Sequence, residues 1–89
     1  MDDLNKYRKQ IDSIDHSIID LLAQRMRCVA KIGVIKKDQG IAPFDKKRWR
    51  ALLEDRLEAG TVLGLSNVLI KQIWNSIHEH ALEIEKNHE

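Results

Sequence analysis

The chain has 89 residues, which is the size of one domain near the small end of what folds independently. Its net charge of +1 at pH 7 creates no large field of one sign, which argues against general binding to nucleic acid or a membrane. The sequence contains no apolar run of about 18 residues and no secretory leader pattern. We therefore expect a single cytoplasmic domain spanning residues 1–89.

Residues 3–38 are predicted to form one long helix that begins at an aspartate cap and ends before a break at 40–43. Side chains spaced alternately four and three residues apart fall on one face of such a helix. That stripe consists of Leu4, Arg8, Ile11, Asp15, Ile18, Leu22, Arg25, Val29, Ile32 and Lys36.

Three cations interrupt this apolar stripe, namely Arg8, Arg25 and Lys36. A positively charged pocket with hydrocarbon walls is a natural receptor for a small dianion. Arg25 and Lys36 are three helical turns apart, so they project within about 20° of each other with Cα atoms about 16 Å apart. Arg8 is too far along the helix to join the same site within one chain.

The length of this helix predicts a dimer. A 35-residue helix extends about 52 Å, whereas a compact domain of this size is about 30 Å across. The stripe stays apolar along its whole length. The part of the helix that extends beyond the domain therefore needs another surface to bury its apolar side chains. We expect an intertwined homodimer in which each chain covers its partner and Arg8 completes the partner's site.

A second helix is predicted over 45–59, with Gly60 as its C-terminal stop. Asp45 either caps this helix or accepts a hydrogen bond from a ligand hydroxyl, and Arg48 belongs either to a solvated basic face or to a ligand site. Periodicity alone does not decide between the two roles of either residue.

A third helix is predicted over 66–87, with Ser66 as its N-cap. His78 and His80 point in different directions on this helix and are expected to be solvated or capping residues rather than metal ligands. Cys28, in the first helix, is expected to be a small buried residue. No long stretch alternates with period two, so the fold class is all-α, with one long helix and two shorter ones. We expect no metal site and no cofactor.

Three segments closely resemble the all-helical chorismate mutase family: YRKQIDSID at 7–15, LLAQR at 21–25 and IGVIK at 32–36. The shared pattern is an arginine, then I-x-x-I-D, then L-L-x-x-R, then a lysine eleven residues later. The resemblance continues through Asp45 and Arg48 into the third helix and covers almost the whole chain. It involves the same cations that the apolar stripe singled out.

The resemblance implies a homodimeric chorismate mutase that rearranges chorismate to prephenate. Arg25 and the partner's Arg8 would hold the two carboxylates. Lys36 would contact a carboxylate and the ether oxygen of the breaking bond, while Asp45 would receive the ring hydroxyl. The catalytic candidates are then Lys36, Arg25 and Glu85. The substrate-binding candidates are Arg8, Arg25, Lys36, Asp45, Arg48, Trp49, Ala81 and Glu85.

Two positions depart from the family's pattern. Trp49 stands where bacterial members usually have a glutamate that recognises the ring hydroxyl, and Glu85 stands where they usually have a glutamine that donates to the ether oxygen. An ionised carboxylate cannot donate a hydrogen bond, so Glu85 would need a proton for full activity.

Trp49 keeps open two alternatives on the same scaffold, an isochorismate-pyruvate lyase that forms salicylate and a mutase acting on an amino analogue of chorismate. A remote alternative is a non-enzymatic dimerisation or nucleic-acid-binding module that uses the basic residues of 46–50. That alternative leaves Arg8, Arg25 and Lys36 unexplained.

Overall fold

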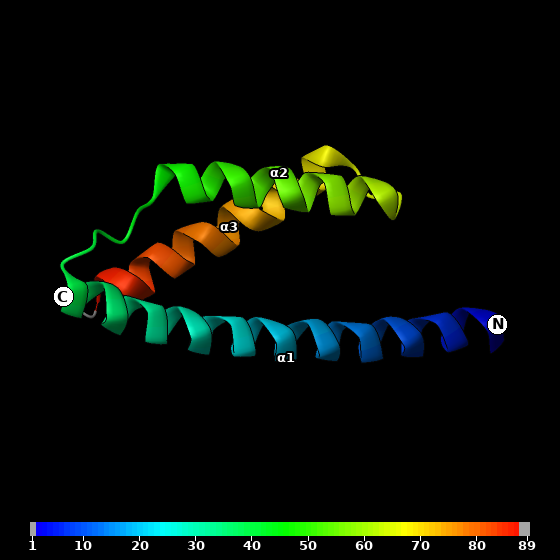
Figure 1. Ribbon diagram of the computed structural model, residues 1–89. Helices are drawn as coiled ribbons and strands as arrows, with labels where there is room; N and C mark the ends of the chain where they lie inside the picture. The colour runs from blue at the N-terminus through cyan, green and yellow to red at the C-terminus, as the bar shows by residue number, and fades with distance from the viewer. Residues whose placement is uncertain (1, 88–89) are drawn as a thin grey trace.

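The computed structural model describes residues 2–87. The ends of the expected 1–89 domain, residues 1, 88 and 89, lie outside this description. Within it the chain forms the helices α1 (Asp2–Gln39), α2 (Lys46–Val62) and α3 (Asn67–Lys86), and the described residues contain no strand (Figure 1). The prediction of an all-α chain with one long and two shorter helices is confirmed.

Local chemistry sets the starts of the two shorter helices. The Asp45 side chain accepts a hydrogen bond from the backbone N–H of Arg48, and Ser66 accepts one from Leu69. The Ser66 cap was predicted, and capping was one of the two roles left open for Asp45. Each cap satisfies a backbone donor that the first turn of a helix leaves free. Beyond the end of α1, Gly40 has a φ of 69°, a left-handed conformation that a glycine adopts without steric cost.

Gly60 does not stop α2, contrary to expectation, because the helix continues to Val62. Gly60 is buried, and a Cβ atom at this position would lie 2.7 Å from Cγ1 of Ile70. The glycine therefore permits close approach of α2 and α3, while Gly64, with a φ of 82°, lies in the turn between the two helices.

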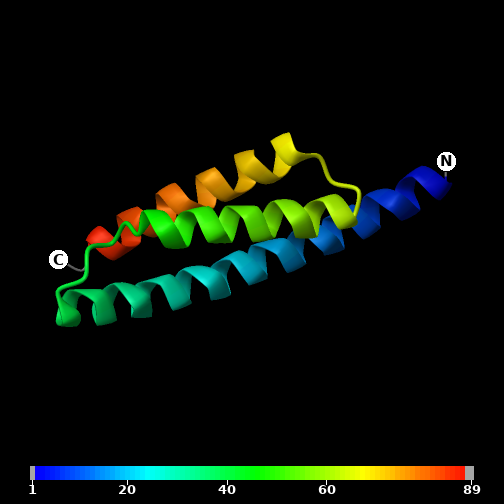
Figure 2. The ribbon, with the colours of Figure 1, turned by 45° about the horizontal axis from the view of Figure 1, so that its top comes forward.

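Helix α3 packs against both α1 and α2, which do not pack closely against each other. Figure 2 shows α1 extending past the turn that joins the other two helices. The buried apolar side chains are few and come from all three helices: Val29, Leu52, Ile70 and Ala81. The core therefore lies along α3, where this helix packs against the C-terminal half of α1 and against α2.

The N-terminal half of α1 has no cover within the chain. Leu4, Ile11 and Ile18 are 54%, 55% and 49% exposed. The molecule measures 57 × 23 × 14 Å, with a radius of gyration of 16.4 Å, whereas a compact domain of this length has one of about 12 Å. The extension of α1 beyond the rest of the domain, which its length predicted, is thus present.

The expectation that Cys28 is buried is wrong, because its side chain is exposed. Cys28 precedes the buried Val29 by one residue, and this step turns a side chain about 100° around a helix. Within residues 2–87, no helix is long and apolar enough to cross a membrane.

Candidate active site

A cavity of about 240 Å³ lies between the C-terminal half of α1, the start of α2 and the C-terminal half of α3. Its apolar wall includes Val29, Ile32 and Leu52. The predicted site residues that line it are Arg25, Lys36, Asp45, Arg48, Trp49, Ala81 and Glu85. The fold therefore brings together residues that are up to 60 positions apart in the sequence, from Arg25 to Glu85.

Lys36 and Glu85, which both line the cavity, form an ion pair with 2.7 Å between Nζ and Oε1. Lys36 also donates a hydrogen bond to the backbone oxygen of Pro43 over 2.7 Å. Glu85 Oε1 makes no aligned hydrogen bond, so its contact with Lys36 is mainly one of charge. Glu85 is only 8% exposed, although it lies near the end of α3. This carboxylate therefore holds the lysine in place and is itself part of the cavity wall.

Arg25 is half-buried, and its buried Nη1 has no hydrogen-bond partner among the described residues. Burial lowers the pKa of its guanidinium, and the positive charges of Arg56 and Arg48 lower this pKa further. These effects all disfavour the charged form, yet an arginine stays protonated in proteins. The site thus holds an excess of positive charge that an anionic ligand would stabilise.

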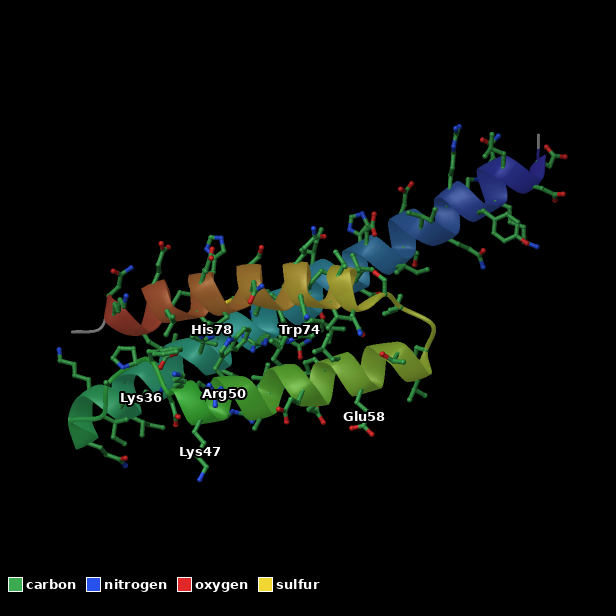
Figure 3. All side chains as sticks on the ribbon, turned by 90° about the horizontal axis from the view of Figure 1, so that it is seen from above. Lys36, Lys47, Arg50, Glu58, Trp74 and His78 are labelled. Atoms are coloured by element: carbon green, nitrogen blue, oxygen red, sulfur yellow. The ribbon has the colours of Figure 1, made fainter. Side chains whose placement is uncertain are left out.

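For Asp45 and Arg48, the structure combines the structural role and the cavity-lining role between which the sequence did not decide. Asp45 caps α2 through Oδ1 and also lines the cavity. Arg48 supplies the capped N–H, and its side chain lines the same cavity. Farther round α2, Lys47 points away from the helices into solvent (Figure 3). The basic residues of 46–50 are thus divided between the cavity and the outer surface.

His78 lines the cavity, which the sequence interpretation missed when it treated both histidines of α3 as solvated or capping residues. Its imidazole stacks on the indole of Trp49 with 4.0 Å between ring centroids and 14° between planes. The signal was present in the spacing, since His78 precedes Ala81 by three residues and Glu85 by seven. These offsets place all three side chains on one face of a helix. His80, off this face, is exposed as expected.

Arg8 does not line this cavity. It is exposed on the overhanging half of α1, 17 residues before Arg25, which corresponds to about 25 Å along the helix axis. Its place in a partner's site stays a prediction.

A second hollow, an apolar groove of about 890 Å³, runs along the middle of the molecule between the three helices. Leu22, Leu69 and Ile73 are among its walls, and Trp74, labelled in Figure 3, lines it from α3. Arg25 lines both this groove and the polar cavity. A side chain of a molecule bound in the groove would therefore lie close to the polar cavity.

The chain matches the chorismate mutase type II family over residues 7–86. It is 32% identical over 75 residues to a T-protein of Enterobacter agglomerans, which covers 84% of this chain and 20% of the relative. A T-protein of Haemophilus influenzae is 32% identical over 73 residues, or 82% of this chain and 19% of the relative.

The chain thus spans about a fifth of the length of these curated relatives. No solved structure matches it significantly. The family match covers nearly all of the described helices and every residue that lines the polar cavity. This chain is a member of the chorismate mutase type II family.

Proposed function

We propose that this chain catalyses the rearrangement of chorismate to prephenate, most simply in the cytoplasm. One observation carries the proposal. The half-buried Arg25, with an unpartnered Nη1, shares a cavity of about 240 Å³ with Lys36 and Arg48, and hydrocarbon forms much of the remaining wall. Such a cavity favours a small molecule with two carboxylates and an apolar ring.

The residue set suits a unimolecular rearrangement. In this reaction a C–O bond breaks and a C–C bond forms within one molecule, so no proton transfer or nucleophile is required. The protein needs to hold the flexible dianion in its compact reactive conformer. It also needs to stabilise the negative charge that develops on the ether oxygen. Cations fixed on rigid helices perform both tasks.

Lys36 is the candidate donor to the ether oxygen. Its ion pair with Glu85 and its hydrogen bond to Pro43 fix the ammonium at the cavity wall before a ligand arrives. Glu85 would be the second group near this oxygen. In its ionised form it would oppose the developing charge, whereas a protonated carboxyl would donate a hydrogen bond. We therefore expect activity to depend on a proton at Glu85.

We also propose an intertwined homodimer in which the partner's Arg8 completes each cavity. The exposed apolar stripe of α1 and the apolar groove of about 890 Å³ are complementary in chemistry, and each lacks a cover in the single chain. If the α1 of a second copy lies along this groove, it passes beside Arg25. Two guanidinium groups could then hold the two carboxylates of the substrate.

The test is to incubate the pure protein separately with chorismate and with isochorismate and to identify the products. We expect prephenate from chorismate, and loss of this activity in Arg25→Ala. Salicylate and pyruvate from isochorismate, without prephenate from chorismate, would favour the lyase alternative. If neither substrate is converted, the proposed enzyme function is wrong.

A further inference from the structure

The imidazole of His78 contacts aromatic side chains from two other parts of the chain. It stacks on Trp49 of α2 at 4.0 Å and contacts Phe44, from the segment between α1 and α2, with 5.8 Å between centroids and 58° between planes. His78 itself belongs to α3. Contacts from two directions restrict the ring to one orientation at the cavity wall.

One nitrogen of this ring is left without a partner. His78 Nε2 is buried and makes no hydrogen bond to any of the described residues. Leaving a buried polar nitrogen unpaired is unfavourable, so such atoms usually bind water or a ligand. Because His78 lines the polar cavity, a molecule bound there would supply the missing partner.

We propose, on the basis of the proposed function, that His78 is a specificity-determining residue whose Nε2 forms a hydrogen bond with the ring hydroxyl of the substrate. Trp49, which replaces a hydroxyl-recognising glutamate of the family, would act as a positioning residue that holds the imidazole through the stack. An indole N–H donates only, so Trp49 cannot accept a hydrogen bond as a glutamate does. The stacked histidine would restore an acceptor nearby.

The electrostatics of the cavity indicate that His78 binds a neutral group of the ligand rather than one of its carboxylates. Burial lowers the pKa of His78, and Arg25 and Lys36 lower it further, against the opposing effects of Glu85 and Glu79. The ring is therefore neutral at pH 7 and above. Carboxylates would bind the fixed cations, whereas a neutral imidazole pairs well with a hydroxyl, as acceptor or as donor.

The test compares chorismate with an analogue that lacks the ring hydroxyl. His78→Phe retains a ring for the stack and removes both nitrogens. We expect kcat/KM for chorismate to fall about tenfold and kcat/KM for the deoxy analogue to stay within about twofold. His78→Gln, whose amide reaches a similar position, should recover part of the loss. His80→Phe, on an exposed histidine of the same helix, is the matched control.

An equal loss on both substrates, or no loss on either, would overturn the assignment to the hydroxyl. Calorimetric titration with a stable bicyclic dicarboxylate mimic of the transition state, with and without the hydroxyl, tests it independently of turnover. Equal affinities of the wild-type protein for the two mimics would also overturn it. If no prephenate forms but the hydroxyl preference is present and is lost in His78→Phe, the proposed function fails and this inference stands.

Discussion

The two halves of α1 carry the same pattern but have different surroundings. Both halves continue one apolar stripe with cations set into it. The C-terminal half packs against α3, buries Val29 and Gly33, and lines the polar cavity with Arg25 and Lys36. The N-terminal half presents Leu4, Ile11 and Ile18 to solvent, and its Arg8 lines no described cavity.

The difference arises from helix length. α3 has 20 residues and α1 has 38, which correspond to about 30 Å and 57 Å. The shorter helix cannot cover the longer one, whatever its direction. A stripe that is apolar beyond the reach of its own chain indicates a surface for another molecule. The same residue pattern thus lines a cavity where its own chain covers it, and we propose that it forms an interface where its own chain does not.

The largest effect is expected from the covered half. Arg25→Ala removes a cavity guanidinium and should lower kcat/KM for chorismate by about 100- to 1000-fold, because loss of one charged anchor also misplaces the substrate. Steady-state kinetics measures the loss, and circular dichroism should show unchanged helix content. Arg27→Ala, at an exposed position on the same helix, is the control. Similar kinetics for the two variants would contradict the assignment of Arg25.

We expect Arg8, in the N-terminal half of α1, to act in the site of a second chain. Arg8→Ala alone should lower kcat/KM by about 100-fold. When Arg8→Ala and Arg25→Ala chains are unfolded together and refolded as a mixture, activity should return to about a quarter of the wild-type value. Half of the dimers are then mixed, and each mixed dimer contains one complete site of two.

The controls are the two variants refolded separately, which should both stay inactive. If the mixture is no more active than these controls, Arg8 does not act across a dimer interface. If Arg8→Ala alone keeps full activity, the residue has no part in the site.

A charge placed on the uncovered stripe should weaken the dimer. Ile18→Asp places a carboxylate in the proposed interface and should cost about 2 kcal/mol or more, which would raise the dimer dissociation constant about thirtyfold. Analytical ultracentrifugation over a concentration series measures this change. Gln10→Asp, on the same exposed half but off the stripe, should leave dimerisation unaffected. Equal behaviour of the two variants would argue against the stripe as the interface.

The smallest effect concerns protonation within the covered half. A carboxyl group donates a hydrogen bond only when it is protonated, whereas a glutamine amide donates at every pH. Glu85→Gln should therefore raise kcat/KM for chorismate at pH 8 about tenfold, because the amide supplies a donor to the ether oxygen. Steady-state kinetics measures the change. An unchanged or lower kcat/KM in Glu85→Gln would contradict the role of Glu85.

Much of the fold could be predicted because its determinants are local. The spacing of the apolar stripe predicted α1. Ser66 was predicted to cap α3, and capping of α2 was one of two roles considered for Asp45, because capping chemistry acts within three residues. Arg25 and Lys36 were placed on one face by helical periodicity alone. Gly60 was misread because its role depends on Ile70, a residue of the next helix.

The sequence by itself determined that this chain is helical, that α1 is too long for its own domain and that cations lie on the apolar stripe. Only the tertiary structure decided which neighbours those cations have. The ion pair of Lys36 with Glu85 and the stack of His78 on Trp49 each join residues of different helices. Their partners are 49 and 29 positions apart in the chain, beyond what periodicity within one helix can relate.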